Sequence, residues 1–268
     1  MIIRHEDLVG TFEQRKALVA QFNLMDDTFF SVVMGHNDAA EYLLTVLLGK
    51  PIKIIENKTQ YSIRNIENHS IVLDALVEDE EHNMYNVEVQ VGDKKNHERR
   101  IRYYRTAMDW SFLQKGRDYS ELPETYMIFI SDFDPFELEK VHYKIVQYVE
   151  GTQREYNNGV HIHYFNTVIN DGTFLSELMQ YFKDSDPNNK KFGALSKQVE
   201  YLKNQNGGVA DMCKAVEEYA KEYAREREEK GKIDTIKNML KDGLSIEKAL
   251  KYTGIDRQTY EKYAGQMQ

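Results

Sequence analysis

The chain has 268 residues, a formal net charge of -9 and a hydrophobic content of 41%. That content, with 12% aromatic residues, excludes an intrinsically disordered chain. A single cysteine excludes a disulfide scaffold and a four-cysteine zinc module, and it favours a reducing cytoplasm as the localisation. We find no apolar run long enough to span a membrane and no apolar segment of a signal peptide, so no membrane association is expected. The acidic excess argues against a general nucleic-acid coat, so contact with DNA would need a local basic stripe or a bound cation.

Helices are predicted in the first part of the chain, before Pro51. Apolar residues recur at intervals of three and four over residues 22–35, where Gly35 is a plausible end. A second apolar helix is predicted over residues 39–50, ending at Gly49. The N-terminal part therefore contributes helices to the core.

The pattern changes to short β-rich runs over residues 52–91, of which the last two are separated by the acidic, turn-like stretch EDEEHN. A long helix is predicted over residues 96–115, followed by an apolar strand after Pro123 and two further strand-like runs. From about Phe174 the pattern is helical to the end. This order predicts an α/β (α+β) core with helices on a mixed sheet.

The C-terminal part, residues 186–268, is predicted to form a helical tail separate from a domain over residues 1–185. The stretches SDPNNKK and KNQNGGV have the composition of linkers. KEYAREREEKGK is polar on nearly all faces, so this helix is either exposed or pairs with another chain, and we expect a homodimer through the tail. The last two short helices resemble a helix-turn-helix in outline, but their near-neutral sequence favours dimerisation or packing.

Two neighbouring strands carry the candidate chemistry. Asp74 lies among apolar residues, and in MYNVEVQV the residues alternate, so that Glu88 and Gln90 share the face opposite the valines. In an antiparallel hairpin closed around Glu81, Asp74 and Glu88 would lie directly opposite each other, with Cβ atoms about 5 Å apart. Carboxylates that close repel, so one must hold a proton or a cation must lie between them.

Oxygen ligands of this kind favour Mg²⁺, Mn²⁺ or Ca²⁺ over zinc. The argument depends on register, because a shift of one residue moves Glu88 to the other face of the sheet. The alternative interpretation is that Asp74 is a satisfied polar residue of the core and that Glu88 is merely solvated.

An ordered series of motifs resembles the PD-(D/E)XK nuclease superfamily, and within it the Rpn-type family of recombination-promoting nucleases and putative transposases. The matching residues are Asp74 on one strand, Glu88-Val89-Gln90 on the next, an Arg/Tyr-rich helix with Arg99, Arg100, Tyr103 and Tyr104, a turn with Gly116 and Tyr119, and upstream Asp27 and Phe30. The resemblance implies a restriction-endonuclease-like mixed sheet flanked by helices.

The resemblance also implies metal-assisted hydrolysis of DNA phosphodiester bonds. Asp74 and Glu88 would hold Mg²⁺, or Mn²⁺ in its place, with the Val89 carbonyl as a third ligand and Asp27 completing the shell. Gln90 would bind the attacking water, since an amide supplies neither a positive charge nor a base. The general base stays undetermined.

The long helix supplies the basic stripe that the net charge requires. Arg99 and Arg100 are candidate phosphate ligands, and Tyr104, one turn from Arg100, is a candidate for the same surface. The alternative is that Tyr104 belongs to the core and that the arginines form a solvated face. Ser31 stands where the upstream motif usually has lysine, and Gln90 where the wider superfamily has lysine.

Three functions therefore compete. The first is an active Mg²⁺-dependent DNA endonuclease. The second is a catalytically degenerate nuclease fold that binds DNA or a protein partner, which Gln90, Ser31 and the net charge favour. The third is a regulatory or oligomeric scaffold in which the helical tail matters most.

Overall fold

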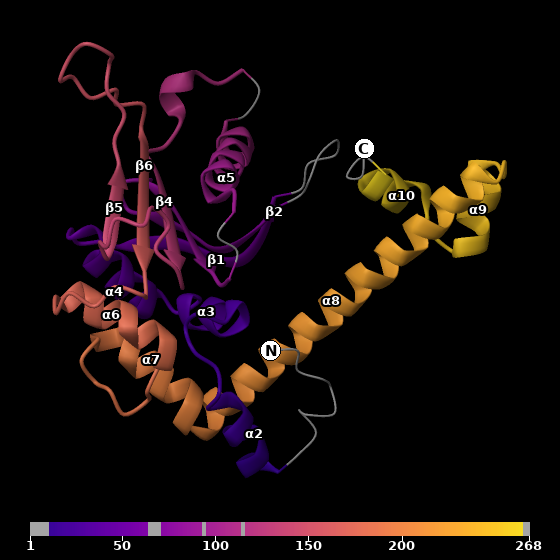
Figure 1. Cartoon of the computed structure of the whole chain (residues 1–268). Helices are drawn as coiled ribbons and strands as arrows, with labels where there is room; N and C mark the ends of the chain where they lie inside the picture. Colours follow the sequence, from indigo (N-terminus) through magenta and orange to yellow (C-terminus); the bar gives the residue numbers. More distant parts are fainter. Residues whose placement is uncertain (1–10, 64–70, 93–94, 114–115, 265–268) are drawn as a thin grey trace.

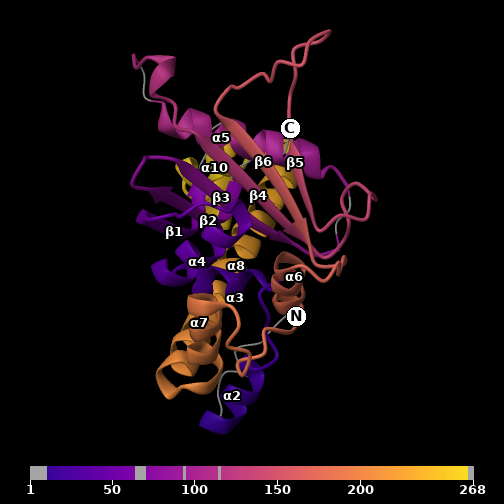
Figure 2. The same ribbon diagram turned by 90° about the vertical axis from the view of Figure 1, so that its left-hand side faces the viewer.

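A computed structural model describes residues 11–63, 71–92, 95–113 and 116–264. The N-terminal residues in which we expected no signal peptide fall outside this part of the chain. A mixed sheet forms the centre, helix α5 (His97–Phe112) covers one face, and a group of helices covers the other (Figures 1 and 2). The predicted class, an α/β (α+β) mixed sheet flanked by helices as in restriction endonucleases, is confirmed.

The sheet has six strands in the order β1-β2-β3-β4-β6-β5. Its central pairs, β3–β4 and β4–β6, are parallel, and the pairs β1–β2, β2–β3 and β5–β6 are antiparallel. The strands are β1 (Ile54–Ile63), β2 (Ile71–Asp79), β3 (Met84–Gln90), β4 (Thr125–Ser131), β5 (His142–Ile145) and β6 (Val160–Asn166). The β-rich runs of the sequence thus form one sheet, in which IKIIE and TQYSIRN contribute to a single long strand, β1.

The two helices predicted before Pro51 end at Gly35 and Gly49, as the sequence indicates. Besides α5, the described helices are α2 (Phe12–Val19), α3 (Asp27–Met34), α4 (Asn37–Leu48), the short 3-10 helix η1 (Tyr119–Glu121), α6 (Phe174–Asp184), α7 (Gly193–Asn204), α8 (Asn206–Lys241), α9 (Ile246–Thr253) and α10 (Arg257–Ala264). Gly49 ends α4 in the left-handed conformation, with φ of 67°, which glycine adopts without steric cost. In the tail, the Ser245 side chain caps α9 by accepting the Lys248 N–H.

Two hydrophobic cores lie on the two faces of the sheet. Tyr85, Val87 and Val89 pack on the face covered by α3, α4 and α6, as their alternation predicts. Met84 packs on the opposite face, against α5. Strand β3 is therefore buried on both sides, and the polar residues Glu88 and Asn86 enter the interior because they share the face of Met84.

The turn between β2 and β3 is the acidic stretch, as predicted. The Asp79 carboxylate accepts the backbone N–H groups of Glu81 and Asn83 at 3.0 and 2.9 Å, and the Tyr85 hydroxyl donates to it at 2.5 Å. Glu81 itself is exposed. These bonds fix the length of the turn and with it the register of the hairpin.

The KNQNGGV stretch is not a linker, and that interpretation was wrong. Gln205 is the single residue between α7 and α8, and both glycines lie in the first turn of α8. A Cβ atom on Gly208 would lie 2.1 Å from the backbone oxygen of Tyr201. Glycine is thus required because the two helix backbones approach closely, not because the chain is loose.

Helix α8 starts in the body of the molecule and then leaves it (Figure 1). Its first turns bury Val209, Met212 and Val216 in the same core as α3 and α4. A separate small cluster at its far end joins Ile233 and Ile236 to the last two helices. The proposed division at residues 185 and 186 stays a prediction. Among the described residues, no helix combines the length and the apolar character that crossing a membrane requires.

Candidate active site

The candidate site lies where strands β2 and β3 separate. Their paired residues run from Glu78 opposite Met84 to Ala75 opposite Val87. This is the register expected for a hairpin closed around Glu81, and its next step places Asp74 opposite Glu88. The predicted register is therefore confirmed, and both carboxylates lie at the end of the ladder, where the two backbones part.

Each carboxylate binds the backbone of the opposite strand. The Glu88 Oε1 atom accepts the Asp74 N–H at 3.3 Å, and the Asp74 Oδ2 atom accepts the Val89 N–H at 3.0 Å. The N–H and C=O of one residue point to the same side of a strand, so the Val89 carbonyl faces Asp74 as well. Asp74, Glu88 and the Val89 carbonyl thus converge at one point of the sheet.

The environment of both carboxylates opposes their ionisation. Burial raises the pKa of Asp74 to about 7, and Asp27 adds to that, against the Val89 N–H and Arg100, which lower it. Burial also raises the pKa of Glu88 well above its usual value, with Asp74 as the second cause. Glu88 is only 5% exposed. Two such carboxylates favour a proton or a cation between them.

Arg100 joins Gln90 to this pair. Its guanidinium donates to the Gln90 Oε1 atom, and its Nε donates to the Tyr104 hydroxyl at 3.1 Å. The positive charge lowers the pKa of Asp74, of Glu88 and of Asp27. The lysine of the wider superfamily is absent at Gln90, and a charge from α5 stands beside that position instead.

Asp27 lies in the first turn of α3 and is exposed. Partial desolvation raises its pKa, Asp26 adds to this, and Arg100 opposes it. Asp27 also raises the pKa of Asp74. The structure thus brings Asp27, Asp74, Glu88, Gln90 and Arg100 to one region.

The other predicted DNA ligands are placed differently. Arg99 is exposed on the first turn of α5, and within the described part of the chain it does not contact the carboxylates. Tyr104 is half-buried: its hydroxyl accepts from Arg100, and its ring packs against the core beneath α5. It therefore belongs partly to the core and partly to the surroundings of the carboxylates. Its pKa is raised by burial and by Glu88.

The residues present fit a hard divalent cation in the chemistry of their donors. Two carboxylates with raised pKa values and a carbonyl offer oxygen alone, which Mg²⁺ and Mn²⁺ prefer. Within the described residues, no three His, Cys, Asp or Glu side chains lie close enough together to hold a metal ion, so Asp27 does not join Asp74 and Glu88 in one group of ligands. The Val89 carbonyl, solvent and substrate oxygens would therefore have to supply the remaining ligands, with Asp27 near by.

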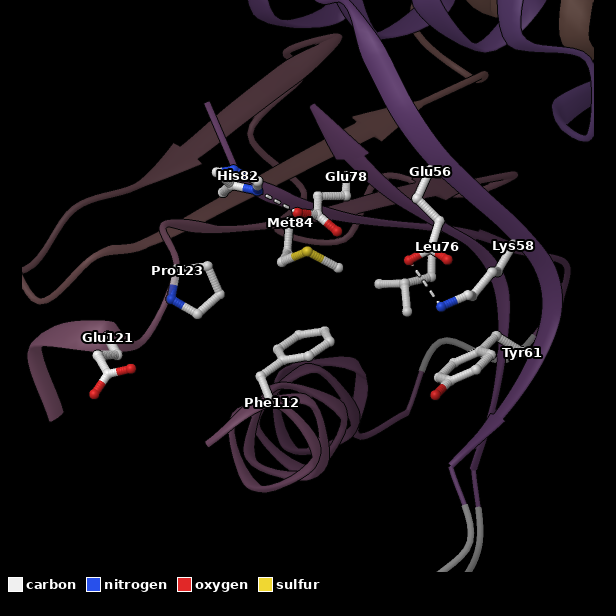
Figure 3. A pocket seen from close by; sticks show the side chains of 10 residues that line it. All are labelled: Glu56, Lys58, Tyr61, Leu76, Glu78, His82, Met84, Phe112, Glu121 and Pro123. Carbon is white, nitrogen blue, oxygen red and sulfur yellow. Dashed lines mark hydrogen bonds and ion pairs between the residues drawn. The ribbon is translucent and has the colours of Figure 1, made fainter. Parts of the chain in front are cut away.

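A pocket of about 350 Å³ lies further along the same hairpin, and Figure 3 shows its lining. Leu76 and Met84 form part of its floor beside Phe112 of α5. Its acidic side chains Glu56 and Glu78 pair with Lys58 at 2.8 Å and with His82 at 2.6 Å. None of the predicted site residues lines this pocket, and its three glutamates make it a poor place for phosphate.

Sequence reasoning missed Gln60 of β1. Its φ is 50°, a left-handed conformation that is uncommon outside glycine, and its side chain binds Ser31 of α3. No turn signal surrounds Gln60 in the sequence. The one available indication was Ser31 itself, which replaces lysine in the upstream motif and therefore needed a different partner.

The sheet topology, the flanking helices and the acidic pair at the parting strands define a protein of the nuclease-fold class. The sequence profile of PD-(D/E)XK nuclease family transposases matches residues 26–235. Because this match spans most of the chain, the chain belongs to that family, and the resemblance drawn from the motifs is confirmed. No protein with a curated description and no solved structure is significantly similar to the chain.

Proposed function

We propose that the chain is a divalent-metal-dependent DNA endonuclease of the recombination-promoting, transposase-associated type. One observation carries the proposal. Asp74 and Glu88 lie opposite each other at the end of the β2–β3 ladder, and the pKa values of both are raised. Strongly raised pKa values next to a specific charged partner are characteristic of functional sites.

Asp74, Glu88 and the Val89 carbonyl would hold Mg²⁺, or Mn²⁺ in its place. Bound there, the cation would lower the pKa of a water molecule and neutralise charge that develops on the phosphate. Asp74 is held for this role by the Val89 N–H, and Glu88 by the Asp74 N–H.

Gln90 and Arg100 would act on the substrate side of the pair. Arg100 holds the Gln90 amide oxygen, which orients the amide, and a guanidinium binds phosphate oxygens in two directions at once. Arg100 would therefore stabilise the charge on the phosphate that the lysine of the wider superfamily stabilises elsewhere. Arg99, exposed on the same helix, would bind a neighbouring phosphate.

A plasmid-nicking assay with Mg²⁺, Mn²⁺ or EDTA tests the proposal. The isosteric variants Asp74→Asn and Glu88→Gln keep the acceptors of both backbone bonds and remove the negative charges. We expect metal-dependent nicking by the wild type and none by either variant. Equal nicking by all three proteins would assign the activity to another site or to a contaminant.

A degenerate nuclease fold that binds DNA or a protein is the second candidate. The contact between Arg100 and Gln90 favours it, because Gln90 accepts from a cation and has no basic group to offer a water molecule. Salt-sensitive DNA binding without cleavage under any divalent metal supports this candidate. Measuring DNA binding and DNA cleavage together in the presence of Mn²⁺ separates the two functions, because only the endonuclease would cleave the DNA that it binds.

The proposal includes a homodimer and a cytoplasmic setting. The middle of α8 leaves the body of the molecule as a charged helix, and a helix polar on most faces pairs with another chain or stays solvated (Figure 1). A dimer would present two sites to two DNA strands. Sedimentation at several protein concentrations tests the dimer.

A further inference from the structure

Ser31 connects three elements around Asp74. It is 4% exposed, its hydroxyl donates to the Asp74 backbone oxygen at 3.4 Å, and the Gln60 amide donates to that hydroxyl at 2.7 Å. A hydroxyl has one proton. Because Gln60 already donates to the oxygen, that proton is free to point at Asp74.

The same face of α3 carries Asp27. Asp27 and Ser31 are four residues apart in the helix, so their side chains lie one turn apart on one face. The bond from Ser31 to the backbone of Asp74 therefore also sets the distance between the Asp27 and Asp74 carboxylates.

Gln60 is held in an unfavourable backbone conformation at this point. Its neighbours Thr59 and Tyr61 pair with Ala75 and Leu73, so Gln60 lies opposite Asp74. Its φ of 50° disturbs the regular alternation of the strand. Lys58 and Tyr61, three residues apart, consequently line the same pocket.

Strand β2 changes face at the same place. Leu73 and Leu76 are three residues apart and pack in one core, although a regular strand would turn them to opposite faces. Asp74 lies between them. Left-handed conformations of residues other than glycine cost energy and concentrate at functional sites.

We propose that Ser31 and Gln60 are positioning residues that hold Asp74 in place for the metal, an inference that rests on the proposed function. Gln60 orients the Ser31 hydroxyl, and Ser31 holds the Asp74 backbone where the ladder of β2 and β3 ends. The serine thereby takes a structural part in the site at the position where the family motif usually has lysine.

Mn²⁺ binding, followed by electron paramagnetic resonance, tests the network alongside melting temperature and nicking. Ser31→Ala and Gln60→Met remove the two donors without adding charge. We expect both to weaken Mn²⁺ binding roughly tenfold to a hundredfold, the range seen when groups that orient metal ligands are lost. Ser31→Thr keeps the hydroxyl and should restore binding.

Gln60→Gly separates positioning from stability. It removes the same donor but relieves the backbone strain, so it should melt at a higher temperature than Gln60→Met and yet bind Mn²⁺ as weakly. Asn57→Ala is the matched control. Asn57 also joins β1 to α3, through a bond of 2.6 Å to the Met34 carbonyl, but it does not touch Asp74. It should lower the melting temperature and leave Mn²⁺ affinity unchanged.

The outcomes distinguish the two proposals. A wild type that binds no Mn²⁺ overturns the proposed function and this inference together. A wild type that binds Mn²⁺, with Ser31→Ala and Gln60→Met binding it equally well, overturns the inference alone. Metal affinity that follows melting temperature across all the variants assigns the network to stability and also overturns it.

Discussion

The Asp74 and Glu88 carboxylates bridge the gap between their strands: the Glu88 carboxylate accepts the Asp74 N–H, and the Asp74 carboxylate accepts the N–H of Val89, the residue after Glu88. Side chains thus replace the backbone ladder at the point where it ends. The arrangement holds the buried Glu88 and the half-buried Asp74 carboxylates close together. Repulsion between the two carboxylates destabilises the folded protein when both are ionised, and a bound cation removes this repulsion.

The first prediction concerns the neutral isosteres of this pair. Asp74→Asn should abolish nicking, with a loss of at least roughly a hundredfold. The same change should raise the stability of the metal-free protein at neutral pH by on the order of 1 kcal/mol, because the buried negative charge is gone. Nicking kinetics and chemical denaturation measure the two effects. A variant that loses both activity and stability would mean that Asp74 serves the fold.

The second prediction concerns pH. The pKa of Asp74 is about 7 in the folded protein against an ordinary value of 3.8, so the folded state binds the proton more tightly than the unfolded state. The contribution of protonated Asp74 to the free energy of unfolding is fully present below about pH 4 and is lost as the pH rises through about 7. Metal-free melting temperatures should therefore fall over this interval, beyond any fall seen in Asp74→Asn.

Saturating Mg²⁺ should reverse that fall at neutral pH, because the cation replaces the proton. Melting curves with and without Mg²⁺ at several pH values measure the effect. Identical curves for the wild type in Mg²⁺ and in EDTA at neutral pH would exclude binding at this pair.

The register of the site was predictable from the sequence, whereas its surroundings were not. An acidic turn between two β-rich runs was sufficient to place Asp74 opposite Glu88, because antiparallel pairing is symmetric about its turn. The contact of Arg100 with Gln90 depends on how α5 docks on the sheet, which helical periodicity does not specify. Periodicity showed only that Arg100 and Tyr104 share a face.

Local signals failed where tertiary contacts decide the conformation. Gly207 and Gly208 resemble a linker, but the close approach of α7 and α8 requires a small residue within the helix. Gln60 has no turn residues beside it, yet it adopts a left-handed conformation, and its side chain binds Ser31 of α3. Neither feature is visible to rules that consider only neighbours along the chain.

The third prediction concerns Arg100. Arg100→Ala should lower the rate of nicking roughly a hundredfold to a thousandfold, as the loss of a charge-stabilising donor does in other active sites. It should also bind Mn²⁺ at least as tightly as the wild type, because a positive charge beside the carboxylates opposes a cation. The nicking rate of Arg100→Lys should lie between those of the wild type and Arg100→Ala, because lysine keeps the positive charge and loses the paired N–H donors of the guanidinium.

Arg102→Ala is the control, because Arg102 is exposed on the same helix and outside the cluster of contacts around Gln90. It should change DNA affinity slightly and leave the rate of the bound complex unchanged. Wild-type rates in Arg100→Ala would contradict the assignment of this residue to the chemistry.

The fourth prediction concerns the tail. Ile233 and Ile236 of α8 are fully buried against Ala249 and Ile255, in a cluster separate from the two cores of the sheet. Ile236→Ala should therefore unfold α9 and α10 locally, since a small cluster does not tolerate the loss of about 2 to 5 kcal/mol. Hydrogen exchange should accelerate over residues 233–264 and stay unchanged in β2 and β3. If the dimer forms through the tail, the same variant should sediment as a monomer while each monomer retains Mn²⁺ binding. Faster exchange throughout the sheet would show instead that the tail and the nuclease core unfold as one unit.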